Sequence, residues 1–241
     1  MRGSKKKRNH ILLVFVLLML LGGILFWAKG EMCFWSGVQV MKGKKTVAER
    51  LEQYGQAAGE RWKPYFTAAG LDYPPKKVLL VGIKSQKKLE VWGADGEDFR
   101  FLREYPILAA SGRLGPKRRA GDNQVPEGIY QVESLNPNSR FHLALRLNYP
   151  NPYDQEMAKR DGREDLGGDI MIHGSNCSIG CLAMGDEAAE DLFVLAAETG
   201  IEKVSVLLTP VDFRKEKLPE LDDPLPEWVG ELYSRIREEM P

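Results

Sequence analysis

Between Lys77 and Phe101 the apolar residues follow a two-residue period, and this pattern constrains the fold more than any other feature of the chain. Val78 to Ile83 is a nearly continuous apolar run typical of a buried strand, whereas residues 89–92 and 99–102 alternate in polarity. Short polar turns separate these runs, so the pattern predicts an antiparallel meander. Further strands are predicted over residues 105–110, 128–132, 141–147, 169–173 and 204–208. The fold class is therefore predicted to be mainly β with peripheral helices (α+β).

Two segments have a helical period instead. Thr46 and Glu49 form a capping-box pattern at the start of a helix that is expected to run to Ala69. A second helix is expected over residues 187–198, with Asp186 as its N-cap. Beyond Phe213 the chain is rich in Pro and acidic residues, which predicts a surface tail or a loosely docked helix. The boundaries that follow are a basic flank and anchor at 1–30, a membrane-proximal helical segment at 31–75, the main domain at 76–213 and the tail at 214–241.

The N-terminus predicts a membrane anchor. Five basic residues precede a run of eighteen uncharged residues, Ile11 to Ala28, which as a helix would be about 27 Å long, close to the thickness of a bilayer core. A basic flank of this kind favours a cytoplasmic N-terminus and export of the rest of the chain. A cleaved signal peptide is the alternative, but residues 26–30 fit a cleavage site poorly. Lipid attachment at Cys33 is disfavoured by the residues before it, Gly30 to Met32.

The charge balance argues against a nucleic-acid partner. Lys and Arg together number 34, as do Asp and Glu, so the net charge is zero and no basic excess is available to bind phosphates. The chain contains three cysteines, Cys33, Cys177 and Cys181, which are too few for a small fold held together by disulfides.

The segment from Ile172 to Met184 carries the residues most suited to chemistry. His173 ends a predicted strand, and Cys181 follows shortly before a predicted helix. An imidazole can pair with a thiolate, and a helix N-terminus just after Cys181 would favour the same anion. Gly174 and Gly180 permit tight turns and close approach of the backbone to a substrate. This arrangement favours nucleophilic catalysis by Cys181.

Other roles for these residues stay open on the segment alone. Cys177 and Cys181 could form a disulfide, or the thiols could be inert packing groups. Zinc is disfavoured because two Cys and one His lack a fourth ligand and the usual paired spacings. A thiol-redox role is disfavoured because the Cys-x-x-Cys spacing is missing.

The segment resembles the active-site signature of the L,D-transpeptidase catalytic domain, the YkuD family, and most closely its YafK-type branch of single-domain exported enzymes. The signature is His173-Gly174 followed by Ser178-x-Gly180-Cys181. The resemblance covers roughly residues 75–213. Its further blocks are Leu114-Gly115-Pro116-Lys117, Gly121-Asp122-x-x-Val125-Pro126-Glu127-Gly128-x-Tyr130, Asn136-Pro137-x-Ser139-Arg140 and Tyr149-Pro150-Asn151-x-Tyr153-Asp154.

The resemblance implies a YkuD-type β-sandwich or barrel-like domain behind one transmembrane helix. It implies Cys181 as nucleophile and His173 as its base, with the imidazole oriented by the carbonyl of Gly174 or Ser175. Ser178 would shape the turn and contact substrate, and backbone N–H groups around Gly180 and Cys181 would stabilise an oxyanion. No metal or organic cofactor is implied. The implied partners are peptidoglycan peptides, the membrane through the N-terminal helix and a wall-attached lipoprotein.

Two departures bear on the reaction. Ile179 and Ala183 stand where the family motif has a histidine and often an arginine, and the spacer from His173 to Ser178 is shorter than in most transpeptidases. Both features resemble the YafK-type branch, for which hydrolysis as well as transpeptidation is known. They favour hydrolysis of a wall or wall–protein link over formation of a new one. The competing hypothesis is a peptidoglycan-binding module without catalytic activity. The expected location is the inner membrane, single-pass, with the catalytic domain on the periplasmic side.

Overall fold

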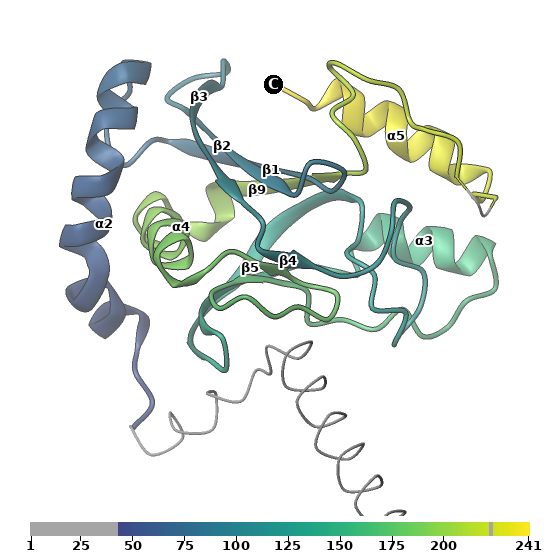
Figure 1. The fold of residues 1–241 in the computed structure, drawn as a ribbon, viewed down its shortest axis with the longest axis horizontal. Coiled ribbons are helices and arrows are strands. Elements are labelled where there is room, and N and C mark those ends of the chain that lie inside the picture. Colours follow the sequence, from purple (N-terminus) through teal and green to yellow (C-terminus); the bar gives the residue numbers. More distant parts are fainter. Residues whose placement is uncertain (1–42, 222–223) are drawn as a thin grey trace, which may run out of the picture. The chain divides into compact units, whose positions relative to one another are not determined.

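The computed structural model describes residues 43–221 and 224–241, which form a mixed sheet surrounded by helices (Figure 1). The helices are α2 (Val47–Ala69), α3 (Pro152–Arg160), α4 (Asp186–Thr199) and α5 (Trp228–Glu238), with a short 3-10 turn at Ile201–Lys203. The strands are β1 (Lys77–Ile83), β2 (Lys88–Ala94), β3 (Arg100–Pro106), β4 (Ala109–Ala110), β5 (Gly128–Ser139), β6 (His142–Leu147), β7 (Met171–His173), β8 (Leu182–Ala183) and β9 (Val204–Thr209).

The strand order across the sheet is β3-β2-β1-β9-β5-β6-β7-β8-β4. Strands β1 to β3 form the predicted antiparallel meander. Strand β9 lies parallel to β1, a crossover that the sequence pattern did not predict. The long strand β5 is shared by two halves of the sheet, because Gly128–Gln131 pairs with β9 and residues 132–139 pair with β6. The prediction of a mainly β fold with helices is confirmed, but α4 is not peripheral, because nine of its residues are buried.

Both faces of β1 are buried, as its apolar run predicts. Val78 and Leu80 join the core that includes α4, whereas Leu79, Val81 and Ile83 join a second cluster against α5. In Figure 1, α4 lies between the β1–β9 half of the sheet and the half that contains β4 and β5.

Helix α2 packs into the same core as the sheet. Thr46 and Glu49 form the predicted capping box, and the helix continues past Pro64 to Ala69. The indole of Trp62 is fully buried, and its N–H donates to the Asp191 carbonyl in α4 at 3.0 Å. Residues 47–69 thus add to the same core as residues 75–213, the part of the chain that carries the sequence resemblance.

The C-terminal segment packs more closely than the sequence pattern predicts. Helix α5 buries five residues along one face, Trp228, Val229, Leu232, Tyr233 and Ile236. The Tyr233 hydroxyl donates to the buried carboxylate of Glu127 at 2.6 Å. These positions have the spacing of one helix face, with charged residues on the other face, and the prediction of a surface tail or a loosely docked helix gave this pattern too little weight.

The predicted anchor is not part of the described structure. Within residues 43–221 and 224–241, no helix is long and apolar enough to cross a bilayer. The uncharged run from Ile11 to Ala28 and Cys33 lie outside the described residues.

Candidate active site

The sheet brings His173 and Cys181 to neighbouring strands. Strand β7 ends at His173, and β8 runs parallel beside it with Ile172 opposite Leu182 and His173 opposite Ala183. Cys181 immediately precedes β8, so this register places its backbone beside that of Met171. The strands thereby fix the backbones of His173 and Cys181 at the two ends of the loop that joins them.

The imidazole of His173 is held in a defined orientation. The side chain is 1% exposed, and its Nδ1 lies 2.6 Å from the Gly174 carbonyl oxygen. A carbonyl only accepts hydrogen bonds, so Nδ1 carries the proton in the neutral ring and Nε2 presents its lone pair. Nε2 is buried and has no hydrogen-bond partner among the described residues. The orienting carbonyl is thus that of Gly174, and the free nitrogen is the one a general base would use.

Burial lowers the pKa of His173, although its hydrogen bond to the Gly174 carbonyl acts in the opposite direction. The Phe141 ring contributes to this burial. It stacks on the imidazole with ring centroids 4.7 Å apart and an interplanar angle of 25°. Phe141 lies in the turn between β5 and β6, far from His173 in sequence, and the sequence carried no signal for this contact.

Cys181 is a free, half-buried thiol. Its Sγ lies 3.5 Å from the Asp169 carbonyl oxygen. Burial raises the pKa of the Cys181 thiol, while the Met171 N–H and the positive charge of Lys117 counteract that rise. A lowered histidine pKa and a raised cysteine pKa favour a neutral imidazole and a neutral thiol. The structure therefore does not support the predicted resting ion pair.

The helix after the loop begins five residues after Cys181. Helix α4 starts at Asp186, and the two residues of β8 stand between it and Cys181. Asp186 instead accepts a hydrogen bond from the Ser175 N–H at 2.7 Å. The helix thus begins where the sequence predicts it, and its effect on a Cys181 thiolate stays a prediction.

Ser178 shapes the turn before the thiol, as predicted. Its hydroxyl accepts the Cys181 N–H at 3.0 Å and donates to the Cys181 carbonyl oxygen. The Gly180 N–H donates to the Ser111 hydroxyl at 2.6 Å. Both backbone donors predicted for an oxyanion are therefore engaged by serine hydroxyls in this structure, and their role with a substrate stays a prediction. Ser111 is a contact that sequence reasoning missed.

Gly174 is required at its position for space. A Cβ there would lie 2.7 Å from Asp186 Oδ1, 2.8 Å from the Phe141 carbonyl oxygen and 2.9 Å from the Cβ of His142. Two of these neighbours are in fixed elements, so a side chain would displace the carbonyl that orients His173. The absence of a side chain at Gly174 thus keeps its carbonyl in place, and this carbonyl orients the imidazole.

The structure bears on two alternative roles of the cysteines, a disulfide and a metal site. Because Cys181 is free, the Cys177–Cys181 disulfide is not formed. Among the described residues, no group of three His, Cys, Asp or Glu side chains is arranged to hold a metal ion.

The chain matches the model of the L,D-transpeptidase catalytic domain (YkuD) over residues 76–207, more than half of its length. The chain therefore belongs to the L,D-transpeptidase catalytic domain family. It is 39% identical over 118 residues to YafK of Escherichia coli (strain K12), which bears the name of an L,D-transpeptidase. That match covers 48% of this chain and 46% of YafK, so the chain spans about half the length of the curated relative.

Two solved structures are similar to this chain, to different degrees. The helical cell shape determining protein Pgp2 of Campylobacter jejuni is 26% identical, with a TM-score of 0.45 over 56% of this chain and 48% of Pgp2. L,D-transpeptidase 1 of Mycobacterium tuberculosis is 18% identical, with a TM-score of 0.32 over 55% of this chain and 62% of that protein.

Proposed function

We propose that this protein is an acyl-transfer enzyme that attacks peptide links of peptidoglycan through a thioester on Cys181. Family membership supports a role in peptidoglycan modification. The observation that carries the catalytic assignment is the free Nε2 of His173. A buried, unpartnered ring nitrogen is costly unless a substrate or a reacting group uses it. The strand that ends at His173 pairs with β8, which directly follows the free Cys181.

In the first half-reaction, His173 Nε2 takes the proton from Cys181 Sγ while the sulfur attacks the carbonyl carbon. The tetrahedral intermediate then collapses to a thioester, and the proton on Nε2 leaves with the departing amine. General-base help of this kind contributes roughly 10² to 10⁴ in rate. Proton transfer during attack suits the neutral resting pair, since neither group has to carry a buried charge before substrate binds.

The second half-reaction separates hydrolysis from transfer. Sequence comparison with the family motif favours hydrolysis, in part because Ala183 is small. Ala183 is fully buried in β8, however, so it does not form the wall of an acceptor groove. The exposed residue beside the thiol is Ile179, whose surface is 79% accessible. We propose hydrolysis of a wall or wall–protein link as the outcome. The short spacer from His173 to Ser178 supports this proposal.

The test uses the full-length chain, because α2 contributes to the core. Cross-linked wall fragments are incubated with the protein, with and without excess acceptor stem peptide, and the products are analysed by mass. Free cleavage products that are insensitive to acceptor support hydrolysis. Cross-linked dimers that increase with acceptor concentration would assign transfer instead.

A second mass measurement separates an enzyme from a binding module without catalytic activity. We expect a substrate adduct on Cys181 that is absent from Cys181→Ser. Wall binding without any adduct or product, by a folded protein with both His173 and Cys181 intact, would favour the module.

We further propose that the catalytic domain lies on the periplasmic side of the inner membrane. The basic flank and the uncharged run at residues 11–28 support this location. A reporter fused after Pro241 should be active outside the cytoplasm. Activity confined to the cytoplasm would contradict both the location and access to the cell wall.

A further inference from the structure

The turn between β5 and β6 carries the ring that covers the candidate base. Phe141 stacks on the imidazole of His173, and its N–H donates to the Ser139 hydroxyl at 3.0 Å. The next residue, His142, begins β6 with a backbone φ of +72°, in the left-handed region that residues other than glycine adopt rarely. A residue keeps such a conformation where the surrounding structure holds it there. The turn therefore depends on contacts that hold His142 in place.

Helix α4 supplies such a contact through Glu190. Nε2 of His142 lies 2.9 Å from Glu190 Oε1, and the two side chains are 14% and 17% exposed. A carboxylate only accepts hydrogen bonds, so Nε2 is the donor. Helix α2 supports both partners. The Tyr54 ring meets the His142 ring edge-on with centroids 5.4 Å apart, and Arg61 Nη2 lies 3.5 Å from Glu190 Oε2.

The same side of α4 also holds the chain that follows the imidazole. Asp186 lies four residues before Glu190, so the two carboxylates are about one helical turn apart on one side of the helix. The Asp186 carboxylate accepts the Ser175 N–H at 2.7 Å. Ser175 directly follows Gly174, whose carbonyl binds Nδ1 of His173. Helix α4 is thus attached both to the turn that covers the imidazole and to the loop that orients it.

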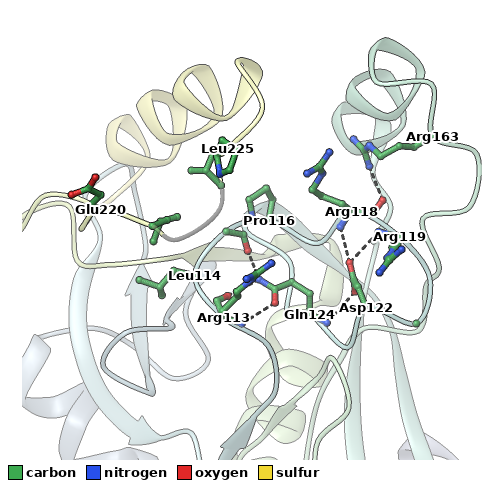
Figure 2. A pocket seen from close by; sticks show the side chains of 14 residues that line it. Arg113, Leu114, Pro116, Arg118, Arg119, Asp122, Gln124, Arg163, Glu220 and Leu225 are labelled. Carbon is green, nitrogen blue, oxygen red and sulfur yellow. Dashed lines mark hydrogen bonds between the residues drawn. The ribbon is translucent and has the colours of Figure 1, made fainter.

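The thiol end of the catalytic loop is held by a different segment. Figure 2 shows the Asp122 carboxylate with hydrogen bonds from backbone N–H groups of the loop from Arg113 to Gln124. Ser111 links this loop to the catalytic turn, because its hydroxyl donates to the Asn123 carbonyl oxygen at 2.7 Å and accepts the Gly180 N–H at 2.6 Å. Helix α4 takes no part in these contacts. A change on α4 should therefore affect the imidazole and leave the turn before the thiol in place.

We infer that Glu190 and His142 are positioning residues, whose hydrogen bond keeps Phe141 stacked on the imidazole of His173. The inference rests on the proposed function and deepens it, because it assigns the residues that hold the candidate base in its working orientation. The pair acts through Phe141 and not on the thiol. Loss of the hydrogen bond would release Phe141 and expose the imidazole to water.

The first experiment observes the imidazole in the absence of turnover. The full-length Cys181→Ala protein is titrated with acid and the ring signals of its three histidines are followed by NMR, with His173→Gln to assign the signal of His173. Burial lowers the pKa of His173, so Glu190→Ala should raise that pKa by uncovering the ring. Removal of a negative charge alone would lower it. A lowered or unchanged pKa would therefore overturn the inference.

Three further variants test the hydrogen bond itself. Glu190→Gln keeps an acceptor for His142 and should leave the pKa of His173 close to that of the parent. His142→Asn suits the left-handed backbone, but its shorter side chain breaks the bond, so it should act like Glu190→Ala. Glu187→Ala removes the same charge from an exposed position of α4 and should leave the pKa in place. Equal changes in all these variants would show that the bond is not responsible, against the inference.

A cycle of substitutions tests the route through Phe141. In the Cys181→Ala protein, Phe141→Ala should raise the pKa of His173 by itself, and Glu190→Ala should then add little. Fully additive changes would mean that Glu190 acts by another route, and the inference would fail. Thermal melting confirms that each variant is folded, and His142→Asn replaces Glu190→Ala in the cycle if the latter does not fold.

Kinetics with Cys181 intact distinguish this inference from the proposed function. Glu190→Ala should lower kcat roughly tenfold, while KM for wall fragments should change less than about twofold. Alkylation of Cys181 by iodoacetamide at pH 8 should keep its rate, and an altered rate would place the change in the thiol turn and overturn the inference. An unchanged kcat would also overturn it. Absence of any Cys181-dependent product in the parent would refute the proposed function, whereas the NMR titration would still test the pair.

Discussion

The phenyl ring of Phe141 lies nearly parallel to the imidazole of His173, with their centroids 4.7 Å apart. One face of the imidazole is thereby covered, and Nδ1 is fixed on the Gly174 carbonyl. Nε2 is left as the nitrogen available to the thiol or to a substrate. Phe141, from the turn between β5 and β6, thus helps to orient the candidate base His173.

Replacing Phe141 with Ala should lower kcat roughly tenfold or more, since the imidazole loses part of its orientation. It should also expose the ring to water. Because burial lowers the pKa of His173, the acidic limb of the rate profile should then move to higher pH. Steady-state rates between pH 5 and 9 provide the measurement. Phe101→Ala, at an exposed phenylalanine of β3, serves as the control and should leave the profile in place.

The pH dependence of the thiol provides a second prediction. Because burial raises the pKa of Cys181 above 9.0, less thiolate is present at a given pH than in an ordinary thiol. Alkylation of Cys181 by iodoacetamide should therefore be slow at pH 7 and rise through pH 9. Rapid alkylation that persists at pH 5 would instead indicate a resting thiolate–imidazolium pair. Peptide-resolved mass analysis separates Cys181 from the other cysteines.

The acidic limb of kcat/KM should lie below pH 6.5. Neutral His173 is the active base, and its pKa is lowered from 6.5 in the folded protein, so activity is retained until the pH falls past that lowered value. The same shift affects stability. The unfolded chain binds this proton more tightly, so the stability contributed by His173 is lost as the pH falls below 6.5. Denaturant titrations of the parent and His173→Gln at pH 5 and 7 would reveal the difference.

The two loop cysteines should differ in function. Cys181→Ser should abolish activity, because a serine hydroxyl at this site is a far weaker nucleophile than a thiol. Cys177→Ser should retain a substantial part of the activity, because Cys177 is not bonded to the free Cys181. Product formation from wall fragments is the readout. Equal losses in both variants would indicate a required disulfide or a relay between the thiols.

Asp191 should be important for stability. This fully buried carboxylate accepts the Tyr105 hydroxyl at 2.7 Å and pairs with Arg61 of α2, also at 2.7 Å. Asp191→Ala would leave these groups unpaired, at a cost of about 3 kcal/mol in the free energy of unfolding. Chemical denaturation measures the change. Glu187→Ala, at an exposed position of the same helix, should cost less than about 1 kcal/mol.

Local patterns predicted much of the fold. The alternation after Lys77 identified the meander, and the capping box at Thr46 identified the start of α2. The helix over 187–198 was found within two residues at each end. These features depend on neighbours in sequence, which a single chain displays directly.

Long-range packing was not predictable in the same way. The stacking of Phe141 on His173 and the hydrogen bond from Gly180 to Ser111 join residues from separate loops. Neither residue has a spacing that distinguishes it from others of its type. The burial that opposes a resting ion pair likewise depends on the packed site as a whole.

The position of β9 has a consequence for how the molecule is made. This last strand of the chain lies in the interior of the sheet, between β1 and β5, and its partner Val78 precedes Val204 by more than a hundred residues. The two halves of the sheet therefore cannot join until almost the whole polypeptide has been synthesised. Contacts so distant in sequence slow folding. The meander of β1 to β3 and the β5–β6 pair therefore lack their shared neighbour until synthesis is nearly complete, so the core is closed late and as a whole.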